Sequence, residues 1–115
     1  MMFNKLILGC SLLLLFVSCG QQQQAKSALK DFMDEELRRD VSYVDFSSVD
    51  STRVISDSLV GALRVRGGRQ LHYAQRQGRT LMHIRANYVL QGDTLSTTFY
   101  MNKDMQGIVA FKDNH

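Results

Sequence analysis

This chain of 115 residues contains no proline and no tryptophan, and its two cysteines, Cys10 and Cys19, lie near the N-terminus. Everything after Cys19 therefore lacks the side chains for a disulfide bond, a thiolate metal site or a cysteine nucleophile. Acidic residues are also absent from one long segment, between Ser58 and Gly92. These absences exclude several classes of site. The uneven distribution of charge is therefore the feature that can indicate a binding surface.

The N-terminal segment has the pattern of an export signal. Lys5 precedes Leu6–Val17, which is almost wholly apolar, and the polar run Gln21–Gln24 follows at once. An apolar stretch of about 12 residues suits a signal peptide. It is too short for a membrane-spanning helix, which needs roughly 20 residues. We therefore expect a signal peptide over residues 1–18.

The end of this segment resembles a known processing site. Phe16-Val17-Ser18-Cys19-Gly20 is similar to the lipobox of bacterial lipoproteins. The resemblance implies that the peptide before Cys19 is removed and that Cys19 receives acyl chains, which anchor the protein in a membrane. Gly20 in place of aspartate resembles lipoproteins of the Gram-negative outer membrane, and the absence of an acidic run after Cys19 favours its periplasmic face. A buried free cysteine is the alternative.

The remaining chain has the size of one domain. We expect a glutamine-rich tether over residues 19–25 and one small domain over residues 26–115. Six phenylalanines, four tyrosines and a hydrophobic content of 44% are typical of a folded domain. The net charge is only +3.

Periodicity predicts the first elements. Apolar residues at helical spacing predict an amphipathic helix over Ala25–Arg39. A β-rich stretch predicts a strand within Val41–Val49, and Thr52–Ile55 allows a second, short one. Ser58–Arg66 fits either a strand or a short helix capped by Ser56 or Asp57, so the sequence leaves both open.

The last third predicts three consecutive strands. Alternation predicts a strand over 81–90, and Gly92-Asp93 predicts a two-residue hairpin turn after it. This turn pairs Tyr88 with Thr97 and Ala86 with Phe99, and it places Arg85 opposite Tyr100 as a cation–π pair. A second turn over 104–107 and a strand over Ile108–Lys112 complete the pattern.

These elements predict an α+β fold with an N-terminal amphipathic helix packed on an antiparallel sheet of about four strands, ending in a three-stranded meander. The order resembles cystatin-like and related α+β roll folds. It resembles more closely a loose group of small envelope lipoproteins of unknown function, through Ser42-Tyr43, Asp50-Ser51, Arg85-Ala86-Asn87, Phe99-Tyr100 and Asn102-Lys103-Asp104. This second resemblance implies fold and location, not chemistry.

Motifs for catalysis and cofactors are not apparent. His72 has no acidic residue within a dozen positions, the acidic residue nearest to His83 is Asp93, ten positions later, and His115 is the last residue. A nucleophilic triad needs a histidine oriented by a carboxylate, which a spatial neighbour would have to supply. No metal-binding or phosphate-loop motif is present. We expect no enzyme activity, no cofactor and no metal.

Six arginines in the acid-free segment are the candidate contact residues, because guanidinium groups match the geometry of carboxylates and phosphates. They are Arg64, Arg66, Arg69, Arg76, Arg79 and Arg85. The alternative is that they pair with the acidic first helix or keep the surface soluble.

The sequence therefore predicts a non-enzymatic, lipid-anchored envelope domain that contacts an anionic envelope component or protein. It predicts membrane attachment through Cys19 and no nucleic-acid partner. A protease inhibitor of the cystatin type is a second possibility, although the Gln-x-Val-x-Gly loop of that family is missing. A small hydrolase using His72 or His83 is a third.

Overall fold

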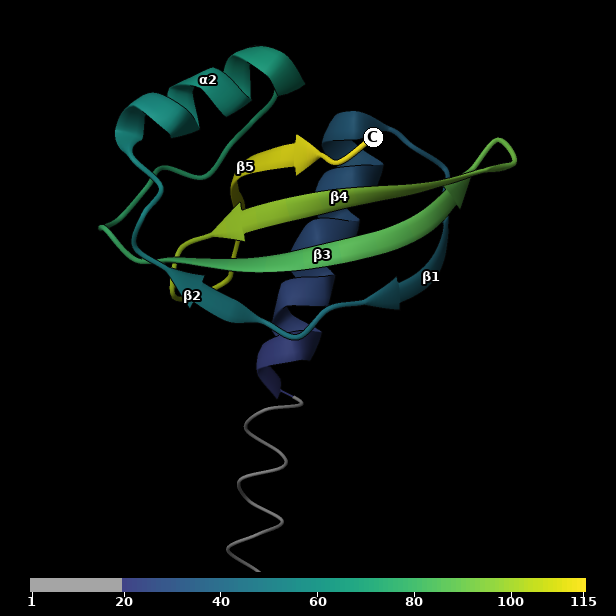
Figure 1. Cartoon of the computed structure of the whole chain (residues 1–115), viewed down its shortest axis with the longest axis horizontal. Coiled ribbons are helices and arrows are strands. Elements are labelled where there is room, and N and C mark those ends of the chain that lie inside the picture. The colour runs from purple at the N-terminus through teal and green to yellow at the C-terminus, as the bar shows by residue number, and fades with distance from the viewer. Residues whose placement is uncertain (1–19) are drawn as a thin grey trace, which may run out of the picture.

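The computed structural model describes residues 20–115, which form an α+β fold (Figure 1). The expected signal peptide and Cys19 lie outside the described residues. A long first helix covers residues 20–32 and ends in a π-helical turn, η1, at Met33–Leu37. The other elements are β1 (Ser42–Phe46), β2 (Asp50–Thr52), α2 (Asp57–Gly67), β3 (Leu81–Leu90), β4 (Asp93–Met101) and β5 (Ile108–Asp113).

The sheet has five antiparallel strands rather than about four. Its order is β1-β3-β4-β5, and the short strand β2 pairs with the start of β3. Since β4 occupies one side of β3, β1 and β2 share the other side and form an interrupted edge. The expected meander is present as β3, β4 and β5.

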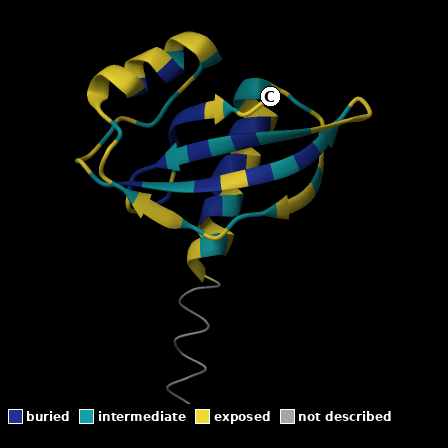
Figure 2. Ribbon diagram, viewed as in Figure 1, coloured by how far each residue is buried: buried dark blue, intermediate teal, exposed yellow. Residues whose placement is uncertain are grey.

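The first helix covers one face of the sheet, as the sequence predicts (Figure 2). Its buried stripe packs on the strands in one core that includes Ala25, Leu29 and Phe32 from the helix and Tyr88 and Phe99 from the sheet. The α+β class and the helix-on-sheet packing are therefore confirmed.

The first helix begins earlier than the expected Ala25. Gln21–Gln24 are helical, and two of them contact the domain. Gln22 Nε2 donates to Ser47 O at 3.4 Å, and Gln24 Nε2 donates to Met105 O at 3.3 Å. The glutamine run that composition predicts as a tether is therefore a helical turn joined to the fold.

The ambiguous segment after β2 is a helix. Ser56 caps α2 by accepting a hydrogen bond from the backbone N–H of Leu59 at 3.1 Å, the usual role of an N-cap serine. Val60 and Leu63 are buried against the second face of the sheet, in a smaller core with Leu81 and Val109. The strand alternative is wrong because the cap starts a helix at this point and the burial of Val60 and Leu63, at i and i+3, stabilises it.

The β3–β4 hairpin forms, but its predicted register is wrong by two residues. The turn is Gln91-Gly92, with φ angles of 52° and 86°, and Tyr88 pairs with Leu95. A two-residue turn with positive φ at both positions favours glycine in the second, which Gln91-Gly92 supplies. A shift of two keeps every side chain on its predicted face. Arg85 therefore lies opposite Thr98, not Tyr100.

Candidate functional site

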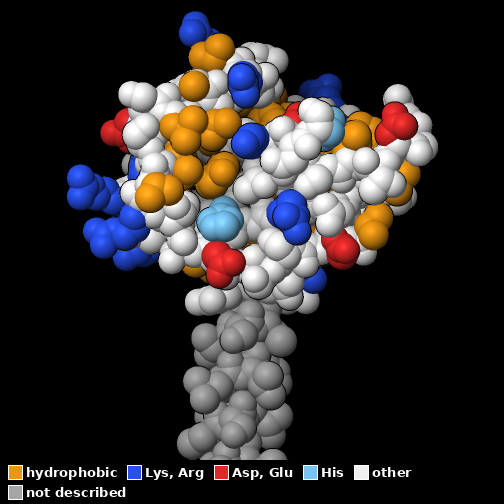
Figure 3. Space-filling view, viewed as in Figure 1, with side chains coloured by type: hydrophobic (Ala, Val, Ile, Leu, Met, Phe, Trp, Pro, Cys, Tyr) orange, Lys and Arg blue, Asp and Glu red, His pale blue; other side chains and the backbone are white. Residues whose placement is uncertain are grey.

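A basic cleft lies where β2 ends and β3 begins. One part, of about 670 Å³, lies between residues 53–57 and Arg76, Gly78 and Arg79. An adjoining part, of about 430 Å³, shares Arg53, Gly78 and Arg79 and reaches Lys103 in the β4–β5 turn. Basic side chains gather on this side of the molecule (Figure 3). We call these two hollows the basic cleft.

The loop before β3 forms one wall of the basic cleft, and Arg76 holds it in shape. Arg76 Nε donates to Gly78 O at 2.6 Å, and its Nη2 donates to Arg79 O at 2.8 Å. Its Nη1 lies 3.2 Å from Asp57 Oδ1 and links the loop to the first turn of α2. Gly78 has a φ of +150°, a conformation that glycine adopts without strain.

A buried asparagine fixes the other side of this loop. Asn102, at the end of β4, is 6% exposed. Its Oδ1 accepts from Gln77 N and its Nδ2 donates to Gln75 O, both at 2.8 Å. Arg76 and Asn102 together bond four backbone polar groups of the loop, so the wall has a defined conformation although it contains no helix or strand.

Three basic residues of the basic cleft point to solvent without a fixed partner. Arg53, Arg79 and Lys103 are exposed. Among the described residues, none of their side chains makes an ion pair or hydrogen bond. Four basic residues line the cleft against two acidic ones, Asp57 and Asp104. Because Asp57 is paired with Arg76, the cleft has free cationic groups suited to a carboxylate or a phosphate.

The six predicted arginines do not form one surface. Arg64 is structural: its Nε donates to Val109 O and its Nη2 to Ala74 O, both at 2.9 Å, and its guanidinium lies 5.2 Å from the centre of the Tyr73 ring. Arg66 is exposed in the last turn of α2, Arg69 is exposed just after this helix, and Arg85 is exposed on β3. Only Arg76 and Arg79 contribute to the basic cleft.

Two residues of the basic cleft were missed by sequence reasoning. Arg53 and Lys103 lie outside the acid-free segment, one before it and one after it. The signal available was weak: Arg53 lies within the short strand that Thr52–Ile55 allows, and Lys103 directly precedes the predicted turn over 104–107. Only the pairing of β2 with β3, and of β3 with β4, shows that these ends meet.

The alternative that the six arginines pair with the acidic first helix is not what the structure shows. Within residues 20–115, Arg76 alone of the six forms an ion pair, and its partner is Asp57 of α2. The acidic residue of the first helix that does find a partner is Glu36, which binds His72.

The structure supplies the carboxylate that His72 lacks in the local sequence. Glu36 Oε1 lies 2.8 Å from His72 Nδ1 and also accepts from His72 N. The backbone hydrogen bond from His72 is the main cause that lowers the pKa of Glu36. The imidazole itself is 92% exposed. His83 lies on the other face of the sheet, 6.1 Å from Tyr100 between ring centroids.

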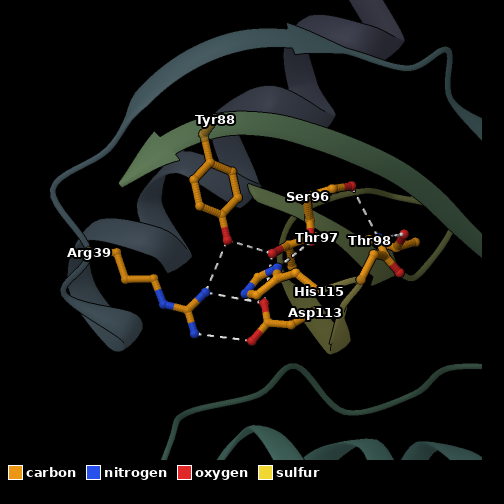
Figure 4. A network of polar contacts seen from close by, with 8 residues as sticks. Arg39, Tyr88, Ser96, Thr97, Thr98, Asp113 and His115 are labelled. Carbon is orange, nitrogen blue, oxygen red and sulfur yellow. Dashed lines mark hydrogen bonds and ion pairs between the residues drawn. The ribbon is translucent and has the colours of Figure 1, made fainter. Parts of the chain in front are cut away.

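A second polar cluster joins the end of the first helix to β5 (Figure 4). Arg39 makes two 3.2 Å hydrogen bonds to Asp113, and Asp113 also accepts from Thr97 at 2.7 Å. Burial alone would raise the pKa of Asp113, but the hydrogen bonds from Arg39 and Thr97 outweigh it and lower that pKa. Each polar group of this cluster has a partner inside it, so its role is structural.

Comparison with protein-family models gives no match, and comparison with curated proteins and with solved structures gives no significant similarity. Within residues 20–115, no helix has the length and apolar character needed to cross a membrane. The same residues bring together no group of three or more histidine, aspartate or glutamate side chains that would hold a metal ion.

Proposed function

We propose that this protein is a lipid-anchored, non-enzymatic domain of the cell envelope whose basic cleft binds an anionic group of a partner molecule. The observation that carries the proposal is the arrangement of Arg53, Arg79 and Lys103 around two adjoining hollows, beside a loop that Arg76 holds in place. The ligand class is a carboxylate or a phosphate, the groups whose oxygens guanidinium forks bind.

Binding is proposed rather than catalysis because of what lines the basic cleft. Guanidinium and ammonium groups hold anions by charge and hydrogen bonds and stay protonated at neutral pH. The histidines that would transfer a proton lie elsewhere: His72 beside Glu36 on the side of the first helix, and His83 on the opposite sheet face.

The anchor and the location are proposed from the sequence. Cys19 in its lipobox-like context carries the acyl chains, and the domain faces the periplasm from the outer membrane. Changing Cys19 to alanine tests this part. We expect the variant to keep its N-terminal segment and to lose the mass of the lipid. A variant with the mass and membrane fraction of the wild type would contradict the anchor.

Anion binding is tested by titrating the full chain, purified in detergent, with sodium phosphate at constant ionic strength. We expect saturable NMR shifts of the Gly78 amide and of the Arg53 and Arg79 side chains. The double variant Arg53→Gln, Arg79→Gln should lose the Gly78 response.

The matched control for this titration is the double variant Arg66→Gln, Arg69→Gln. It removes the same charge from exposed positions at the end of α2, outside the basic cleft. We expect it to respond to phosphate as the wild type does. Equal responses from both double variants would show that the basic cleft is not an anion site.

A further inference from the structure

The β4–β5 turn, which forms one end of the basic cleft, contacts the start of the first helix. Met105, which accepts from Gln24, belongs to the β4–β5 turn that also carries Lys103. Ser47, which accepts from Gln22, lies in the connection between β1 and β2, three residues before β2 begins. One of the three segments that bring free cations to the cleft, the β4–β5 turn, is therefore fastened to the start of this helix.

The first helix leaves no room for a flexible tether between this end and the proposed anchor. Gly20 is already helical and directly follows Cys19 in the chain. From Gly20 to Gln24 the helix rises only about 6 Å, at 1.5 Å per residue. Acyl chains on Cys19 would thus hold the β4–β5 turn within about one Debye length, roughly 8 to 10 Å, of the headgroup layer.

The charge of this end suits an anionic surface. Arg53, Arg79 and Lys103 are exposed, and the acidic side chains beside them are Asp50 on β2, Asp104 in the β4–β5 turn and Asp57, which is paired with Arg76. Cations outnumber acids, and the guanidinium groups border hollows that phosphodiester oxygens can enter. Lipid-anchored proteins commonly add a basic patch as a second membrane contact.

We propose that the partner of the basic cleft is the membrane that holds Cys19, and that the cleft docks on the anionic headgroups of this membrane. This inference rests on the proposed function. The anchor and the basic cleft together fix the orientation of the domain. The first helix stands away from the bilayer. The first turn of α2 borders the cleft, and the rest of α2, at the far end of the first helix, faces the aqueous phase (Figure 1).

The test uses the lipid-bearing chain reconstituted into vesicles of phosphatidylcholine, alone or mixed with phosphatidylglycerol. An arginine-selective dicarbonyl reagent is added, and modification of each arginine is followed by mass spectrometry. In the anionic vesicles we expect Arg53 and Arg79 to react about fivefold more slowly than in the neutral ones, and added salt to remove this protection.

Arg66 and Arg69 serve as controls inside the same molecule, because they are exposed at the end of α2. They should react at the same rate in both kinds of vesicle. If Arg53 and Arg79 behave like these two controls, the docking proposal is wrong. Equal protection of all four arginines would also overturn it, because it would mean that the domain has no preferred orientation.

A phosphate arm separates this inference from the proposed function. The same labelling is done in detergent with and without inorganic phosphate. Protection of Arg53 and Arg79 by phosphate but not by anionic vesicles would uphold an anion site and reject docking. Protection by vesicles alone would support docking and reject a discrete anion site. Protection by neither would reject both.

Discussion

The arginines of this protein fall into two groups that the sequence does not distinguish. Arg39, Arg64 and Arg76 are tied: each guanidinium makes two or more hydrogen bonds inside the domain. Arg53 and Arg79 are free: within residues 20–115 their side chains make no hydrogen bond or ion pair, and they face the basic cleft. A guanidinium that meets backbone carbonyls or a carboxylate becomes part of the fold, whereas one left in solvent is available to a ligand.

The largest effect is expected where a tied arginine bridges two segments. Changing Arg64 to methionine keeps an apolar stem but leaves the carbonyls of Val109 and Ala74 without their charged donor. Hydrogen bonds to charged groups contribute about 1.5 to 3 kcal/mol each, so we expect the free energy of unfolding to fall by about 3 kcal/mol. Urea unfolding followed by circular dichroism measures it.

The matched control is Arg66→Met, two residues further along α2, where the side chain is exposed. An exposed substitution of this kind changes stability by about 0.5 kcal/mol or less. Equal losses in the two variants would remove the distinction between tied and free arginines on this helix.

The second effect concerns Arg39 and is sensitive to pH. Asp113 has a pKa below its ordinary value of 3.8 because of its bonds to Arg39 and Thr97. Its ionised form stabilises the fold fully above that ordinary value, and the contribution disappears as the pH falls through the lowered pKa. We expect Asp113→Asn to cost about 2 kcal/mol at neutral pH and to be less sensitive to acid below about pH 4.

Free energies of unfolding of the wild type and of Asp113→Asn, measured from pH 7 to pH 2, check this prediction. Asp40→Asn, a substitution of an exposed residue, is the control. The control should follow the wild-type curve. An Asp113→Asn curve parallel to the wild type over the whole range would show that Arg39 and Asp113 contribute nothing through charge.

The sequence predicts most of the fold because the repeating patterns coincide with burial. The apolar stripe from Ala25 to Met33 and the alternation along β3 are buried as their spacing requires. The features that it misses depend on single positions. Gly92 takes the second position of its turn, so the hairpin register differs by two residues from the predicted one. The Ser56 cap makes the segment after β2 a helix rather than a strand.

The basic cleft is less predictable for a physical reason. Arg53, Arg79 and Lys103 come from three segments that meet only through strand pairing, and their charges lie far apart in the chain. The acid-free segment directs attention to arginines, but it includes Arg64, whose contacts are long-range and internal. No local pattern separates these two outcomes.

A third, smaller effect is expected for Arg76, which is tied but sits beside the cleft. Its ion pair with Asp57 is partly exposed and contributes little to stability. Arg76→Gln should therefore lower the free energy of unfolding by only about 1 kcal/mol. Loss of the bonds to Gly78 O and Arg79 O should still loosen the loop. We expect faster amide hydrogen exchange around Gly78 and weaker binding of phosphate. Unchanged exchange there would show that Arg76 does not position the loop.

The smallest change in stability, and the largest in binding, is expected for a free arginine. Arg79→Gln removes no hydrogen bond made by the side chain, so the free energy of unfolding should stay within about 0.5 kcal/mol of the wild type. Its loss should nevertheless weaken phosphate binding, because one of three free cations of the basic cleft is gone. Unfolding and phosphate titration are both measured on Arg64→Met and on Arg79→Gln. The first variant should lose stability, and the second should lose phosphate binding. A destabilised Arg79→Gln with unchanged binding would mean that this side chain, too, belongs to the fold.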